Sequence, residues 1–343
     1  MKPAPRPSPS DPISDVIELL RPQAVGGCLH AAGSWALRFE PFPHVRFGTV
    51  VRGECWLAIE GQEPVLLREG DFYLLGNPPR YVLASALTVR PRSAKALFAA
   101  SPDGALRLGP DGADDTFVCG GHFSFDDPNA PLLLDVLPTL VHVRAGDAQR
   151  TLFAHLSGLL VAEVEADAAG GRLVIDRLAQ VLFVHMLRAH AERRACPVGW
   201  LGALRDDRIG AALRAMHADM AHRWTLEELA QRAGMSRSAF AASFKSQVGK
   251  APLDYLIQWR MAVARDALRR GTRTISELAS ATGYESESAF STAFRRVVGA
   301  SPKHFRDRRE VVAARGLPAR ARARAVGSSS KPQPLCPSPD DAR

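Results

Sequence analysis

Cys119 and His122 are the two residues whose types and spacing come closest to a chemical site. A thiolate and an imidazole three positions apart can share a zinc ion or form a reactive pair. No second pair of this kind lies nearby in the sequence, which disfavours a metal site. A position in a strand and the turn that follows it is the favoured alternative.

The cysteines as a group indicate reduced thiols. They are odd in number, widely scattered and without a CxxC pair, which argues against a disulfide framework and for the cytoplasm: Cys28, Cys55, Cys119, Cys196 and Cys336. The N-terminus has no apolar run of the kind found in a signal peptide, and no stretch approaches the ~18 apolar residues of a membrane span. We therefore expect a cytoplasmic protein that is not a membrane protein.

The strongest signal in the sequence is a pattern that occurs twice between residues 225 and 306. Matching leucine-alanine pairs and glycines recur at an offset of 49, and matching phenylalanines, glycines and prolines then recur at an offset of 50. Each copy opens with a threonine followed by a glutamate three positions later, Thr225 with Glu228 and Thr274 with Glu277. This spacing predicts a capping box at the start of a helix.

Each copy predicts a helix, a sharp turn and a second helix. Gly234 and Gly283 stand where the first helix ends, because glycine tolerates the left-handed conformation of a C-cap. Two phenylalanines four positions apart then anchor one face of the second helix and leave the other face free. This arrangement is typical of a helix-turn-helix unit, whose second helix can enter the major groove of DNA. The alternative is two helical hairpins that only pack together.

Charge is unevenly distributed along the 343 residues. The formal net charge is +8, and residues 201–343 hold 25 lysines and arginines against 14 aspartates and glutamates. The basic part is thus the part with the repeat, as neutralisation of DNA phosphates requires. The length also allows two domains, each with its own core.

The N-terminal half predicts a β-rich domain. From residue 26 to about 125, short runs of β-branched and aromatic residues alternate with turn residues, which favours an antiparallel barrel or jelly roll. Residues 54–61 and 67–83 resemble the core of a cupin barrel, with a glycine-aspartate step into a strand and a turn that bears prolines. Tyr81 stands where cupins usually have a histidine ligand, and His44 has no partner in a His-x-His pair. A metal-dependent cupin enzyme is therefore disfavoured, and we expect no cofactor.

Six side chains of this half could line the interior of the barrel and form an effector pocket, although the alternation also allows the outer face or the core: His44, Arg46, Trp56, Tyr73, Tyr81 and His122. After residue 138 the pattern becomes helical, with two apolar stripes over about 147–164 and 171–186. These helices predict a homodimer interface, and packing against the barrel is the alternative.

Residues from about 206 to 309 resemble the DNA-binding domain of the AraC family of transcription regulators. The matching positions include Gly234, Pro252, Gly283, Gly299 and Pro302, together with the phenylalanine pairs. Between the repeats, Leu253 to Arg270 predict one continuous helix of roughly 27 Å, which could hold the two second helices about one ~34 Å turn of DNA apart. The N-terminal half resembles the cupin-type effector or dimerisation domain of this family.

The resemblance implies which residues contact DNA. Carried over by position, the base-contacting residues of the first copy are Arg237, Ser238, Ala241, Ala242 and Lys245, and those of the second copy are Glu287, Ser288, Ser291, Thr292 and Arg295. Lys303 and Arg306 are expected to reach phosphates. Because alanines and a threonine stand where longer side chains are common in the family, thymine-methyl contacts, phosphates and DNA shape are expected to carry more of the specificity.

The predicted protein has an α+β fold. A cupin-like antiparallel β-barrel with flanking helices precedes an all-α domain of two helix-turn-helix units joined by a long helix. We expect disorder over 1–10, an effector or dimerisation domain over 11–195, a linker over 196–205, the DNA-binding domain over 206–310 and a disordered basic tail over 311–343. The predicted function is one-component transcription regulation, with promoter DNA, RNA polymerase and an unknown small-molecule effector as partners. The alternatives are an architectural DNA-binding protein and a cupin enzyme tethered to DNA.

Overall fold

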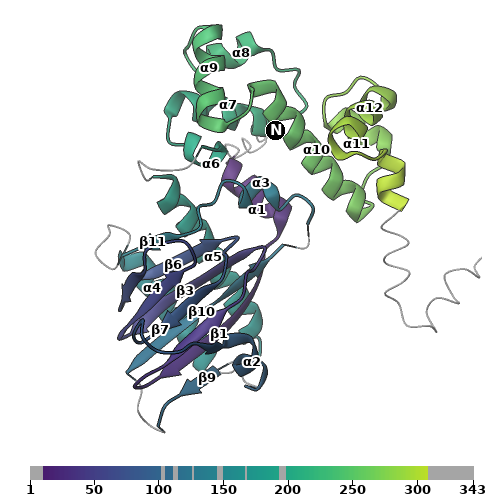
Figure 1. Ribbon diagram of the computed structural model, residues 1–343. Coiled ribbons are helices and arrows are strands. Elements are labelled where there is room, and N and C mark those ends of the chain that lie inside the picture. Colours follow the sequence, from purple (N-terminus) through teal and green to yellow (C-terminus); the bar gives the residue numbers. More distant parts are fainter. Residues whose placement is uncertain are drawn as a thin grey trace, which may run out of the picture. The chain divides into compact units, whose positions relative to one another are not determined.

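The computed structural model describes residues 11–101, 105–110, 115–125, 127–144, 150–166, 168–192 and 198–307 (Figure 1). The segments predicted to be disordered, 1–10 and 311–343, lie outside these ranges. The chain divides into two compact units, residues 1–259 and 260–343. Their boundary falls within helix α10 (Pro252–Arg270), which is continuous, as the sequence predicts for the helix between the repeats.

The first unit begins with helix α1 (Pro12–Leu20). Its apolar residues Ile13, Val16 and Leu20 are buried, as their helical spacing predicts. The carboxylate of Asp11 caps the helix by accepting a hydrogen bond from the backbone N–H of Ile13 at 3.2 Å. Arg21 adopts a left-handed conformation with φ of 45°, and this ends the helix and turns the chain into the first strand.

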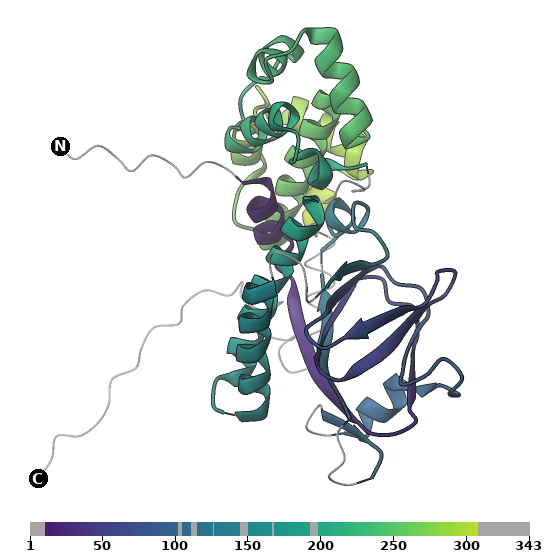
Figure 2. The same cartoon turned by 90° about the vertical axis from the view of Figure 1, so that its left-hand side faces the viewer.

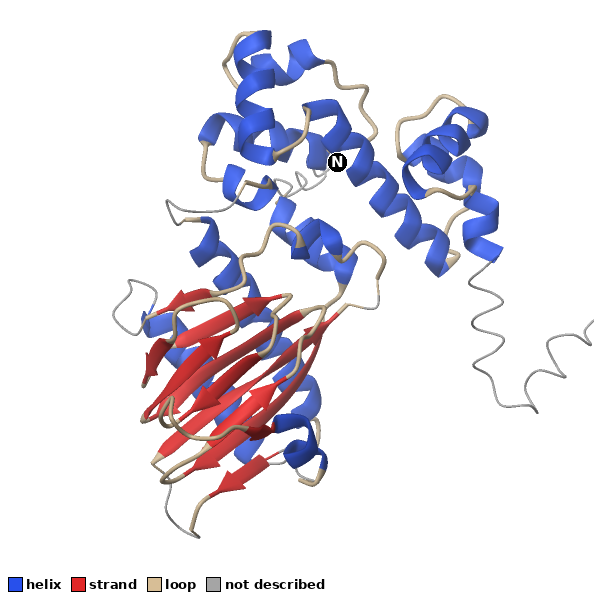
Figure 3. Cartoon of the chain, viewed as in Figure 1, coloured by secondary structure: helices blue, strands red, loops and turns tan. Residues whose placement is uncertain are grey.

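The strands of this unit form two sheets (Figure 3). The six-stranded sheet has, in spatial order, β11 (Val141–Val143), β6 (Phe72–Gly76), β3 (Val45–Arg52), β10 (Thr116–Ser124), β1 (Gln23–Ala31) and β9 (Ala105–Leu108). The five-stranded sheet has, in the same sense, β5 (Val65–Arg68), β4 (Glu54–Ile59), β7 (Tyr81–Ala84), β2 (Ala36–Phe39) and β8 (Arg92–Ser93). Residues of both sheets contribute to one apolar core, which includes Leu37, Leu57, Leu75, Leu83 and Val118.

The predicted antiparallel barrel is therefore corrected to two sheets around a shared core. Among the described residues each sheet ends at edge strands, β11 and β9 in one and β5 and β8 in the other, so the hydrogen bonding does not close into a ring. The sheets are also not wholly antiparallel, because β9 runs parallel to β1 and β8 runs parallel to β2. The short helix α2 (Ala94–Ala99) follows β8 directly and precedes β9.

Two long helices, α4 (Arg150–Ala166) and α5 (Gly171–Ala191), lie on the outer face of the six-stranded sheet and appear in teal in Figure 2. Phe183 of α5 stacks on Phe123 of β10 with ring centroids 4.6 Å apart. Phe153 of α4 lies 5.0 Å from the ring of Phe72 in β6. Both helices were predicted from the sequence, and their large aromatic residues are the ones that fix them to the sheet.

A disulfide joins Cys28 of β1 to Cys119 of β10, so the expectation that the cysteines are reduced is wrong for this pair. The two strands run antiparallel with Cys28 directly opposite Cys119, and their Cα atoms are 4.3 Å apart. A separation of 91 residues in the sequence gives no sign of this contact. Because the thiols are joined to each other, Cys119 does not form a site with His122. Cys55 is a free, buried cysteine, and burial together with the charge of Glu54 raises its pKa to about 12.

The rest of the first unit is helical. It contains α3 (Pro131–Leu134), α6 (Trp200–Ala203), α7 (Asp207–Ala218), α8 (Leu226–Arg232), α9 (Arg237–Val248) and the first part of α10. Helix α6 falls in the predicted linker, yet its residues Trp200 and Leu201 are buried. The indole N–H of Trp200 donates to the backbone carbonyl of Leu132 at 2.8 Å, which ties this part of the expected linker to α3.

The second unit contains the end of α10, α11 (Ile275–Ala281) and α12 (Glu287–Val298), followed by a helical turn over 302–307. Its core is built from fully buried residues of all three helices, including Met261, Leu268, Leu278, Phe290 and Phe294. Arg260 is buried as well, with its guanidinium 5.9 Å from the centre of the Tyr284 ring. Burial raises the pKa of Tyr284, and the charge of Arg260 opposes this rise.

Candidate nucleic-acid interface

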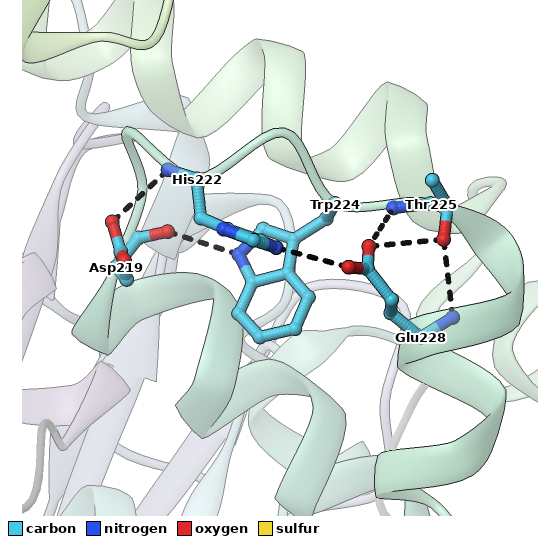
Figure 4. Close-up of polar contacts among 5 residues, drawn as sticks. All are labelled: Asp219, His222, Trp224, Thr225 and Glu228. Carbon is cyan, nitrogen blue, oxygen red and sulfur yellow. Dashed lines mark hydrogen bonds and ion pairs between the residues drawn. The ribbon is translucent and has the colours of Figure 1, made fainter.

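Helix α8 begins with a capping box (Figure 4). The hydroxyl oxygen of Thr225 accepts a hydrogen bond from the backbone N–H of Glu228 at 3.2 Å. The carboxylate of Glu228 in turn accepts from the backbone N–H and the hydroxyl of Thr225, at 2.8 and 2.9 Å. These hydrogen bonds hold the pKa of Glu228 below its usual value, since they favour the ionised carboxylate.

Helix α11 begins in the same way. The hydroxyl of Thr274 accepts from the backbone N–H of Glu277 at 3.2 Å, and the carboxylate of Glu277 accepts from the backbone N–H and the hydroxyl of Thr274 at 2.7 and 3.0 Å. The pKa of Glu277 is lowered for the same reason. The two capping boxes predicted from the repeat are thus both present, with closely matching distances.

The turn after each of these helices is also repeated. Gly234 has φ of 61° and Gly283 has φ of 76°, the left-handed region that a side chain would disfavour. The backbone N–H after each glycine reaches back into the preceding helix, from Met235 to Ala230 at 2.9 Å and from Tyr284 to Ala279 at 2.8 Å. Each pair of helices is therefore joined by the same short turn.

The second helix of each pair is fixed by two phenylalanines. Phe240 and Phe244 of α9, like Phe290 and Phe294 of α12, are fully buried, with ring centroids 5.6 and 5.7 Å apart within each pair. The hydroxyls of Ser236 and Ser286 cap the two helices. With one face held in this way, the opposite face of each helix is largely exposed among the described residues.

The residues expected to contact bases lie on these free faces. In α9 the exposed members are Arg237, Ser238, Ala242 and Lys245, and Ala241 is half-buried; in α12 they are Glu287, Ser288, Thr292 and Arg295, and Ser291 is half-buried. The hydroxyl of Thr292 donates to the backbone carbonyl of Ser288 at 3.0 Å, which engages this donor within the helix. Lys303 is exposed, and Arg306 is half-buried with its Nε 3.9 Å from Asp307.

Two features near these helices were missed by the sequence reasoning. Arg296 is exposed in α12 and directly follows Arg295, which was expected to contact DNA. This adjacency in the sequence could have identified Arg296 as a further candidate. The second is a surface cavity of about 510 Å³ between the end of α7 and α8, lined by residues that include His222, Trp224 and Arg232. Figure 4 shows the ring of Trp224 next to that of His222. The His222 ring lies 4.5 Å from that of Trp224, and the Arg232 guanidinium lies 5.8 Å from it. No periodic pattern points to this cavity.

In the N-terminal domain, Arg46 is the centre of a cluster of aromatic rings. Its guanidinium carbon lies 4.7 Å from the centre of the Phe42 ring and 5.3 Å from that of Phe39. The imidazole of His122 lies 4.9 Å from Phe42, and that of His44 lies 5.4 Å from it. His122 and Arg46 are directly opposite each other in the pairing of β10 with β3, which explains why residues 76 positions apart come together.

The structure brings together most of the predicted effector-pocket residues. Burial raises the pKa of both Tyr73 and Tyr81, and in each case the charge of Arg46 opposes the rise, which indicates that Arg46 is close to both phenols. Tyr81 stacks on Phe39 with centroids 4.6 Å apart. Trp56 is the exception, because its neighbours Cys55 and Leu57 in β4 point into the core and Trp56 therefore points to the opposite face. The sequence pattern also gave no weight to Phe39 and Phe42.

The described residues contain no group of three or more histidine, cysteine, aspartate or glutamate side chains placed to hold a metal ion. Over the described ranges, none of the helices combines the length and the apolar composition that a membrane-spanning segment requires.

The N-terminal and C-terminal parts of the chain each match a known protein family. Residues 11–192 match the cupin family, and residues 229–308 match the helix-turn-helix domain family. A Streptomyces antibioticus protein described as an AraC-like transcription regulator is 41% identical over 299 residues, which cover 86% of this chain and 98% of that relative. The transcriptional regulator AlkR of Acinetobacter baylyi is 32% identical over 71% of this chain and 78% of its own length.

Among solved structures, the DNA-binding domain of AdpA in complex with a target DNA is 31% identical. The aligned residues cover 31% of this chain and 96% of the AdpA domain, and the TM-score is 0.30. The near-complete match to the Streptomyces relative extends over both the cupin part and the helix-turn-helix part. The chain therefore belongs to the AraC family of DNA-binding transcription regulators and carries a cupin-like N-terminal domain.

Proposed function

We propose that this regulator binds promoter DNA sequence-specifically through two helix-turn-helix units, α8 with α9 and α11 with α12. The observation that carries this proposal is the repeated geometry of the two units, each with a capping box, a left-handed glycine and a second helix that buries two phenylalanines and exposes its other face. A free helix face of this kind fits the major groove of DNA.

Within this proposal the two units contribute unequally. Arg237 and Lys245 give α9 two exposed cations, and α12 also has two, Arg295 and Arg296, but it presents the acidic Glu287 in its first turn as well. Arginine pairs well with guanine or a phosphate, and glutamate accepts a hydrogen bond from cytosine. The exposed face of α9 is otherwise short, with Ala241 and Ala242 at its centre. We therefore assign base recognition in α9 to Arg237 and the remaining contacts of α9 to phosphates and DNA shape, and we assign α12 a larger share of base recognition.

The N-terminal domain, residues 11–195, is proposed to sense a small-molecule effector and to form a homodimer. The dimer proposal is supported by five large apolar side chains of α4 and α5 that are between 38% and 61% exposed: Leu152, Leu159, Leu173, Val174 and Val181. These two helices cover the sheet with their other faces, so the exposed residues are free for a second copy of the chain.

The dimer is tested by measuring molar mass in solution. A Leu159→Glu, Leu173→Glu variant is expected to be a monomer at concentrations at which the wild type is a dimer, since a charge in an apolar interface is costly. A Val25→Glu variant changes an equally exposed apolar residue in β1 and serves as the control. A wild-type monomer, or a dimer that survives both charges, would contradict the proposal.

RNA polymerase is the proposed protein partner, because a regulator of this family acts on transcription. Because the proposed function requires contact with promoter DNA, we propose that the protein is located in the cytoplasm.

The function is tested by recovering the genomic fragments that the full-length protein binds and by footprinting it on them. Two protected blocks per protomer, about one helical turn of 10–10.5 base pairs apart, are expected if both helix-turn-helix units enter the major groove on the same face of the duplex. Protection without a shared sequence would point instead to an architectural protein. Metal bound in a stoichiometric amount by the purified protein would favour a cupin enzyme instead.

A further inference from the structure

Arg46 holds a positive charge without an acidic partner. Its guanidinium donates a hydrogen bond to the phenol oxygen of Tyr81. None of the ion pairs formed by described residues includes Arg46, however, and its Nε is buried without a hydrogen-bond partner. The nearest acidic residue along the chain, Glu40, is held by Arg38 at 3.0 Å and by Arg80 at 3.3 Å. The guanidinium of Arg46 thus has an N–H donor without a partner, at Nε, and it lies against the rings of Phe39 and Phe42. This arrangement favours binding of an anion from solution.

Two imidazoles extend this site. The Nδ1 atom of His44 is also buried without a hydrogen-bond partner. Burial lowers the pKa of His44, and burial followed by the charges of Arg46 and His44 lowers the pKa of His122. Both rings are therefore neutral near pH 7, so each can donate a hydrogen bond without adding a second or third positive charge.

The surroundings define the rest of the ligand. Phe39, Phe42, His44, Arg46 and His122 are all half-buried, so they are accessible while being partly removed from water. One permanent cation balances one negative charge, which favours a carboxylate over a doubly charged phosphate ester. The planar guanidinium matches the two oxygens of a carboxylate, and the rings of Phe39 and Phe42 provide flat apolar contacts.

We propose that Arg46, together with His44 and His122, binds the carboxylate group of a small effector with a flat, apolar body. This inference rests on the proposed role of the N-terminal domain as the sensor and adds the chemical class of the molecule that is sensed. The ligand would supply the hydrogen-bond partner that the Nε of Arg46 and the Nδ1 of His44 lack.

The experiment titrates the full-length protein with benzoate by calorimetry and compares benzamide, which has the same shape without the charge, and inorganic phosphate. Benzoate is expected to bind about tenfold more tightly than either of the other probes. Arg46→Gln is expected to weaken benzoate binding about tenfold, and Arg46→Lys, which keeps the charge but loses the fork, is expected to lie between Arg46→Gln and the wild type. Arg107→Gln, at an exposed arginine of β9, is the control and should bind as the wild type does.

The inference is overturned by equal binding of benzoate and benzamide, by tighter binding of phosphate, or by an unchanged affinity in Arg46→Gln. Absence of benzoate binding by the wild type up to its solubility limit would overturn it as well. Binding of the same preparations to the recovered genomic fragments separates this inference from the proposed function. A protein that binds those fragments but not benzoate contradicts only the ligand class, whereas a protein that does not bind DNA contradicts the function itself.

Discussion

The Nδ1 atom of His217 in α7 lies 2.9 Å from the carboxylate of Asp15 in α1. Its Nε2 atom lies 2.8 Å from the hydroxyl of Tyr255 in α10, and the ring stacks on Trp259 with centroids 4.3 Å apart. The imidazole side chain is fully buried, so both of its nitrogens are satisfied away from water. One ring thus links α1, which precedes the sheets, with α7 and with α10, the helix between the repeats.

We predict that His217→Ala lowers the free energy of unfolding by about 2–4 kcal/mol, because it leaves a cavity and removes the partner of Asp15 and Tyr255. Denaturant unfolding of the full chain measures the change. His222→Ala is the matched control, since that imidazole is 42% exposed and its loss should change stability by no more than about 0.5 kcal/mol. Equal losses in both variants would show that the buried ring contributes nothing beyond an exposed one.

The disulfide gives a second prediction. Protein purified without reductant should show Cys28 and Cys119 protected from alkylation, and reduction should lower the free energy of unfolding by about 2–4 kcal/mol, because the bond restricts the unfolded chain. Peptide mass spectrometry and denaturant unfolding with and without reductant measure the two effects. A Cys28→Ser variant should be insensitive to reductant, and a Cys55→Ser variant should keep the sensitivity. Free thiols at both positions in the oxidised protein would contradict the structure.

Gly48 in β3 provides a test of the core. A Cβ atom placed on it would lie 2.5 Å from the ring of Tyr73, so the ring would have to move within a packed interior. Gly48→Ala is therefore expected to lower the free energy of unfolding by about 1–3 kcal/mol. Gly158→Ala in α4, where a Cβ would meet no atom within 4 Å, should raise it by about 0.5–1 kcal/mol because alanine favours a helix. The same sign in both variants would refute the packing argument.

The capping boxes give a pH-dependent prediction. Because hydrogen bonds from Thr274 lower the pKa of Glu277 in the folded state, its contribution to stability is present above the ordinary glutamate pKa of 4.5 and is lost as the pH falls through the lowered value. The melting temperature of wild type should therefore exceed that of Glu277→Gln at pH 7, and the difference should shrink towards acidic pH. Glu285→Gln, at an exposed position between α11 and α12, is the comparison variant. A difference that stays constant with pH would count against an ionised cap.

The repeat made the helical part of the fold predictable. Capping residues, turn glycines and paired phenylalanines are local signals, and Thr225, Gly234 and Phe240 stand where the sequence puts them. The disulfide and the cluster around Arg46 depend instead on the pairing of β10 with β1 and β3, over separations of 91 and 76 residues. Such register has no local signature when glycines interrupt both strands, as Gly26, Gly27, Gly120 and Gly121 do here.

The closure of the sheets was mispredicted for a related reason. Alternating apolar residues predict that strands pack around a core, and they do. The same alternation does not distinguish a closed barrel from two sheets, because both bury every second side chain. Trp56 shows this ambiguity at a single residue. Its type suggested the interior, whereas the parity of β4 places Cys55 and Leu57 there.

Specific recognition of DNA by the exposed faces of α9 and α12 is best tested by the affinity of Arg237→Ala for a recovered genomic site and for random DNA. The variant is expected to lose about 1–3 kcal/mol on the specific site and less on random DNA. Arg107→Ala, which removes an exposed arginine from β9, should bind both DNAs as the wild type does. An equal loss on both DNAs would reduce Arg237 to a phosphate contact and contradict base recognition by α9.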